Sequence, residues 1–142
     1  MRLHAGLAVV VLLLSASAQA GELPVRPAGE WQVTVMGPDG KPRAPRTYCY
    51  AARSVGDITS GLGECARNHI SQAGPTTTIE ASCLKDGHTI AMHMALTSAG
   101  ETAYHARMHA TYSPPIAGMS TMDMESDSKW LGPCPPGVQP VH

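Results

Sequence analysis

Hydrophobic and polar residues alternate one by one along several stretches of the chain. A period of two is the pattern of a β-strand with one buried and one solvated face. Other short stretches are rich in β-branched residues, which favour strands, and turn sequences such as Gly37-Pro38-Asp39-Gly40 separate them. The pattern predicts strands at residues 30–36, 47–50, 65–70, 76–84, 88–96 and 119–131.

The alternating stretch that ends at Leu96 is followed by Ser98-Ala99-Gly100, which suits a three-residue hairpin loop. This loop pairs Thr97 with Glu101 and sets His93 opposite His105. The register sorts the side chains cleanly between two faces. The apolar face holds Ile90, Met92, Met94, Leu96, Tyr104, Ala106, Met108, Ala110 and Tyr112, and the polar face holds His93, His105, Arg107 and His109.

The strands follow one another through short turns, and no helical crossovers are visible between them. We therefore expect an all-β, mainly antiparallel fold, a small meander of six to eight strands that forms an open barrel or a sandwich. At most one short helix is expected, near 51–58. Residues 54–63 and 113–118, which include Pro114-Pro115, are expected to be loops long enough to contact a partner.

The N-terminal residues 1–20 have the composition of a cleavable signal peptide. A short polar start precedes an apolar run at 7–14, and Ala18-Gln19-Ala20 matches the cleavage pattern. We expect a periplasmic protein with a single domain at 21–134, a flexible tail at 135–142 and no membrane span in the mature chain. The formal net charge of −1 and the absence of charge runs argue against nucleic acid as a partner.

Four cysteines in an exported chain indicate two disulfides. A hairpin centred on residue 74 puts Cys65 opposite Cys83, which leaves Cys49 and Cys134 to join the first strands to the last. Four cysteines allow three connectivities. Zinc sites usually draw on closely spaced pairs, and these cysteines are far apart, so disulfides are favoured. The chain lacks Phe, and disulfides would support its thin core.

Several of these features together resemble domain-of-unknown-function family 3617, a group of exported proteins of Gram-negative bacteria. They are the signal peptide, Gly29-Glu30-Trp31 at the first strand, the four spaced cysteines, a late strand containing methionines, and the terminal Leu131-Gly132-Pro133-Cys134. The resemblance implies location and fold. It implies no activity.

Histidines and methionines are the candidate metal ligands. His93, His105 and His109 on the polar face have donors suited to copper or zinc. Thioethers suit Cu(I) in a periplasmic setting, although methionines at alternating positions usually fill a core. The methionines in question are Met92, Met94, Met119, Met122 and Met124.

No nucleophile motif or spaced carboxylate pair marks a catalytic site, so no catalytic residue and no cofactor are assigned. We expect a non-enzymatic binding module for an envelope protein or a small apolar ligand. A periplasmic copper- or zinc-binding protein is the alternative.

Overall fold

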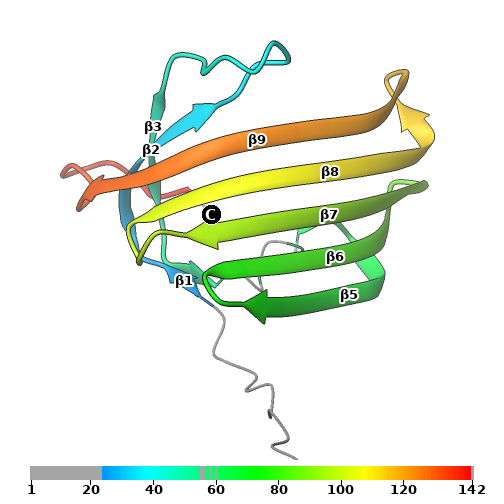
Figure 1. The fold of residues 1–142 in the computed structure, drawn as a ribbon, viewed down its shortest axis with the longest axis horizontal. Helices are drawn as coiled ribbons and strands as arrows, with labels where there is room; N and C mark the ends of the chain where they lie inside the picture. Colours follow the sequence, from blue (N-terminus) through cyan, green and yellow to red (C-terminus); the bar gives the residue numbers. More distant parts are fainter. Residues whose placement is uncertain (1–23, 55–56, 58, 60, 142) are drawn as a thin grey trace, which may run out of the picture.

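The computed structural model describes residues 24–54, 57, 59 and 61–141. These residues build one seven-stranded antiparallel sheet in the order β3-β2-β9-β8-β7-β6-β5, and a separate two-stranded pair, β1 and β4 (Figure 1). The strands are β1 (Val25–Arg26), β2 (Gly29–Val35), β3 (Arg46–Tyr50), β4 (Arg53–Ser54), β5 (Glu64–Ala73), β6 (Thr76–Lys85), β7 (His88–Ser98), β8 (Ala103–Ile116) and β9 (Met119–Gly132).

The sheet is a meander from β5 to β9, and β9 then pairs with β2 from the start of the chain. Figure 1 shows β5 to β9 stacked side by side in a curved sheet, with β2 and β3 standing more upright at one end. The two outer strands, β3 and β5, do not pair with each other, so the sheet stays open. The predicted all-β antiparallel fold is confirmed, in its open form.

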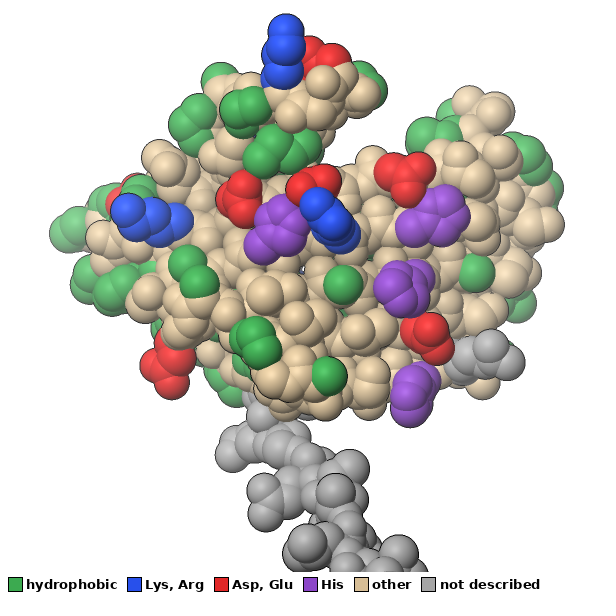
Figure 2. All heavy atoms as spheres, in the orientation of Figure 1, with side chains coloured by type: hydrophobic (Ala, Val, Ile, Leu, Met, Phe, Trp, Pro, Cys, Tyr) green, Lys and Arg blue, Asp and Glu red, His purple; other side chains and the backbone are tan. Residues whose placement is uncertain are grey.

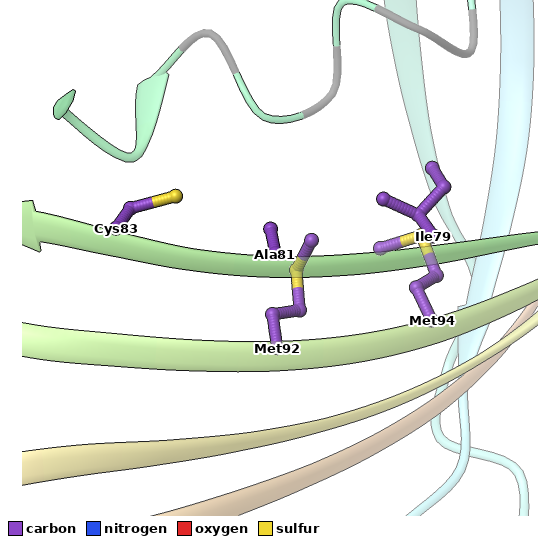
Figure 3. Close-up of a cluster of buried hydrophobic side chains, with 5 residues drawn as sticks. All are labelled: Ile79, Ala81, Cys83, Met92 and Met94. Atoms are coloured by element: carbon purple, nitrogen blue, oxygen red, sulfur yellow. The ribbon is translucent and has the colours of Figure 1, made fainter. Parts of the chain in front are cut away.

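One face of the sheet is apolar and carries the core. Ile79, Ala81 and Cys83 on β6 lie beside Met92 and Met94 on β7, and all five are buried. Figure 3 shows their side chains pointing to one side of the sheet, toward the described part of the segment that precedes β5. Leu62 of that segment packs against this cluster. The predicted apolar face therefore forms as expected from its alternation.

Both predicted disulfides, Cys65–Cys83 and Cys49–Cys134, are present. Cys65 and Cys83 are direct partners across β5 and β6, and a register shift between Cys65 and Arg67 brings them opposite each other. Cys49 lies on β3 and Cys134 just beyond β9, so this bond joins the first strands to the last. Near the end of the tail, the Val141 backbone bridges to Tyr50, while the flexibility of residues 135–142 stays a prediction.

The predicted register of the β7–β8 hairpin is wrong by four residues. Thr97 pairs with His105 instead of Glu101, because the loop is wider than three residues and closes through an N–H···O bond from Ala99 to Ala103 of 2.9 Å. His93 therefore faces His109 rather than His105. A shift by an even number of residues leaves every side chain on its predicted face, so the apolar and polar sets are unchanged.

The predicted loop at 113–118 is also wrong, since β8 continues to Ile116 and only Ala117 and Gly118 form the turn. Pro114 and Pro115 fall where the β8–β9 register shifts, so their missing N–H groups interrupt no regular ladder.

The described part of the expected helix at 51–58 contains the strand β4 instead. Val55, Gly56 and Ile58 lie outside the described residues, as do Ser60 of the expected 54–63 loop and the expected signal peptide. No helix within the described ranges is long and apolar enough to cross a membrane.

Candidate binding groove

The face of the sheet opposite the core is polar and exposed. A single row of cross-strand partners runs over five strands, from β5 to β9. Figure 2 shows histidine, acidic and basic side chains gathered on this face of the molecule. The row consists of His69, Glu80, His93, His109 and Asp123.

Basic and acidic side chains line up along β8 and β9 because the register places them opposite one another. His109 Nδ1 lies 2.7 Å from Asp123 Oδ1, and His105 Nδ1 lies 2.8 Å from Asp127 Oδ1. Between them, the Arg107 guanidinium donates to Glu125 over 3.2 Å. In each pair at least one of the two side chains is half or more exposed, so the pair contributes little to stability. Its main effect is to occupy the carboxylates on this face.

The tip of the β2–β3 hairpin, residues 36–45, overhangs the sheet next to this row of charges. β2 pairs with β9 only up to Ser126, and the last contact is the Met36 N–H to the Glu125 carbonyl, 2.8 Å long. Beyond it the chain leaves the sheet. The tip is held by its own backbone bonds, including Gly37 N–H to Lys41 O (2.8 Å) and Arg43 N–H to Val35 O (2.9 Å).

The tip and the sheet enclose an open groove of about 1200 Å³. In Figure 2 the upper projection stands apart from the rest of this face and leaves a notch beside it. The groove has apolar residues from both sides and basic residues mainly from the tip and β3. The strand register divides its lining between the two faces of the sheet: the apolar face contributes Val33, Val35, Arg46, Tyr48, Met108 and Met124, and the polar face contributes His93, Ala95, Arg107, His109, Asp123 and Glu125. Met36 and Arg43 line the groove from the hairpin tip.

A second, shallower hollow of about 580 Å³ lies over β5 to β8 and includes Glu80, Ser82 and Thr111. His93 and His109 line both hollows. These two imidazoles therefore lie at the boundary between the hollows, and both side chains are exposed.

The structure brings together two of the three predicted metal ligands. His93 and His109 are direct partners, whereas His105 pairs with Thr97 and contacts Asp127. Within the described ranges, no three His, Cys, Asp or Glu side chains are close enough to hold a metal ion. Met92 and Met94 are buried on the apolar face, away from these histidines.

Sequence reasoning missed the groove residues Arg43, Arg46 and Tyr48. The prolines around them predicted irregular or edge structure, and nothing in the pattern indicated that the hairpin would lean over the sheet. Asp123 and Glu125 alternate with Met122 and Met124 along the sequence, and this period of two does place both carboxylates on one face.

The shifted pKa values lie outside the groove, at the end of the sheet near β1. Burial lowers the pKa of the Arg26 guanidinium, which lies 3.9 Å from the centre of the Tyr50 ring. Burial also raises the pKa of Tyr50 and of Tyr104. Tyr104 contacts Trp31, with ring centres 5.5 Å apart. These groups form a structural cluster, because burial is the leading cause of all three shifts.

The fold and the groove define a disulfide-linked, all-β protein built on one open antiparallel sheet. The chain belongs to the family described as "Protein of unknown function (DUF3617)", which matches residues 25–134. That range takes in every strand of the structure. No curated protein and no solved structure matches the chain.

Proposed function

We propose that this chain is an exported, periplasmic, non-enzymatic binding module that holds a small ligand or an envelope partner in the groove between the β2–β3 tip and strands β7 to β9. The observation that carries the proposal is the groove itself, about 1200 Å³ in size and bounded by a hairpin fixed through its own hydrogen bonds. A preformed concave site with apolar walls and a few polar groups is the usual form of a ligand site.

The side chains in the groove favour binding over catalysis. Asp123 and Glu125 are each paired with a neighbouring side chain, His109 and Arg107 respectively. A general base needs a carboxylate or imidazole aimed at substrate, whereas these groups are directed at each other. Metal binding, the alternative function, has less support because His105 lies apart from the His93–His109 pair.

Export is supported by the sequence of residues 1–20 and by the two disulfides, which persist in oxidising compartments. The experiment is mass spectrometry of the protein purified gently from the cell envelope. Under denaturing conditions we expect a chain that begins at Gly21. Recovery only from the cytosol, with residues 1–20 still attached, would contradict export.

Under native conditions the same protein should carry the additional mass of a ligand or partner. Ala95→Trp, which fills the groove, should remove that mass. Ala73→Trp is the matched control, because Ala73 is exposed at the end of β5 and does not line the groove. Equal retention by the two variants, or no retained mass in the unmodified protein, would refute the binding role.

A further inference from the structure

We infer that the groove takes an amphipathic anion, a molecule with an apolar body and a terminal carboxylate or phosphate. This inference rests on the proposed function and names the class of ligand. It follows from how charge and apolar surface are divided within the groove.

Arg43 and Arg46 provide positive charge that the described part of the chain does not neutralise. Both side chains are exposed and line the groove. The ion pairs of the described residues use Arg107, His105 and His109, and neither Arg43 nor Arg46 is among them. The groove thus contains three arginines and two carboxylates, in a protein whose formal net charge is −1.

An arginine without a partner suits a planar, bidentate acid group such as a carboxylate or phosphate. The two arginines follow the hairpin tip onto β3, so a headgroup bound to both would lie at the side of the groove formed by this hairpin. Asp123 and Glu125, on the sheet side, are already paired. The register places both carboxylates on the polar face, opposite Met124, so the arginines are the groups left to hold the headgroup.

The rest of the ligand would meet apolar surface. Val33 and Val35 of β2 and Met108 and Met124 of the sheet line the same groove, and the strand register places them on one face of the sheet together with Arg46. Methionine side chains adapt to irregular shapes, and burying a methylene contributes about 0.8 kcal/mol. An acyl chain or a similar apolar body therefore gains affinity that a small inorganic anion does not.

The test is isothermal titration calorimetry with chain-matched probes, each below its critical micelle concentration. Dodecanoate and dodecyl phosphate offer an anionic head, dodecyltrimethylammonium offers a cationic one, and acetate has no long chain. We expect one molecule of either anionic probe to bind at least about tenfold more tightly than the cationic probe or acetate, the factor typical of a good charged hydrogen-bonded pair.

The variant Arg43→Gln/Arg46→Gln should weaken binding of dodecanoate by about tenfold or more. Lys41→Gln/Lys129→Gln is the matched control. It removes the same charge and includes a residue of the same hairpin, and neither lysine lines the groove. All four side chains are exposed, so both variants should unfold at the temperature of the unmodified protein, which circular dichroism checks.

Equal affinity of the two double variants, or equally tight binding of the cationic probe, would overturn the inference. A neutral or cationic ligand found on the protein from the envelope, with no binding of dodecanoate or dodecyl phosphate, would overturn the ligand class while leaving the binding role intact. If the purified protein retains no ligand, both the ligand class and the binding role are contradicted.

Discussion

At the scale of single residues, the surroundings of Gly29 explain why the first long strand begins with a glycine. Its φ of 145° is a conformation that L-residues rarely adopt. A Cβ at this position would collide with Trp130 Nε1 and the Gly132 carbonyl. The neighbouring indoles hold the lead-in to β2, since Trp31 Nε1 donates to Pro27 O over 3.1 Å and Trp130 Nε1 to Ala28 O over 3.3 Å. The Gly29-Glu30-Trp31 motif is therefore a packing requirement.

We predict that Gly29→Ala lowers the free energy of unfolding by about 3 kcal/mol, because strain and overpacking act together. Gly40→Ala is the control. Gly40 also has a positive φ, 72°, but an added Cβ there meets open space, so the expected loss is about 1 kcal/mol. Urea denaturation followed by tryptophan fluorescence measures both, and equal losses would contradict the packing role of Gly29.

Thr77 is fully buried on the apolar face, and its hydroxyl has no hydrogen-bond partner among the described residues. An unsatisfied buried hydroxyl costs free energy. Thr77→Val should therefore stabilise the protein by about 1 kcal/mol, whereas Thr121→Val, at an exposed position on β9, should change stability by less than about 0.5 kcal/mol. Destabilisation by Thr77→Val in thermal unfolding would show that this hydroxyl is satisfied.

The free energy of unfolding should fall as the pH rises through and above about 10, the ordinary pKa of tyrosine. Burial raises the pKa of Tyr104 and of Tyr50, and the Tyr104 hydroxyl donates to the Glu101 carbonyl over 3.2 Å. In this range the unfolded chain loses the tyrosine protons first, so rising pH favours unfolding. Urea midpoints measured between pH 9 and pH 11 should show the decrease, and Tyr104→Phe should reduce it. An undiminished decrease in Tyr104→Phe would contradict this assignment.

At the scale of elements, the two disulfides close loops of very different length. Cys65–Cys83 links residues 18 apart within one hairpin, and Cys49–Cys134 links residues 85 apart at the other end of the sheet. The entropy of the unfolded chain makes the longer loop more stabilising, about 4.5 against about 3 kcal/mol.

Replacing Cys49 and Cys134 together with Ala should therefore destabilise the protein more than replacing Cys65 and Cys83. Both pairs include a buried sulfur, at Cys49 and at Cys83, so the comparison is matched for burial. Denaturant unfolding without reductant gives the two free energies. The reverse order would mean that local packing, and not loop closure, determines their contribution.

The elements also show what alternation in the sequence determines and what it leaves open. It fixed the face of every residue in β7, because Ile90, Met92 and Met94 share one side in any register shifted by an even number. It did not fix the partner of His93, since loop width decides between His105 and His109. The cysteine pair was found correctly even though a bulge after Cys65, invisible in the sequence, completes the alignment.

At the scale of the whole molecule, the open sheet separates two kinds of surface. The apolar face carries the core cluster, against which Leu62 packs, and the polar face carries the paired charges and the second hollow, whereas the groove is lined from both faces. The groove forms because β2 separates from β9 after Val35. It therefore depends on how segments far apart in the sequence are arranged in space. Arg43 and Arg46 stand in a proline-containing stretch with no periodicity, so only the three-dimensional arrangement identifies them as groove residues.

The central claim is that this groove is occupied in the cell. Its most direct test places the photoreactive residue p-benzoylphenylalanine at Tyr48, an aromatic residue of the groove, or at Gln72, an exposed residue of β5 outside it. Living cells are irradiated, and the mass of the intact purified protein is measured by mass spectrometry. We predict a discrete gain in mass for the Tyr48 variant and none for the Gln72 variant. No gain at Tyr48, or the same adducts at both positions, would contradict the account.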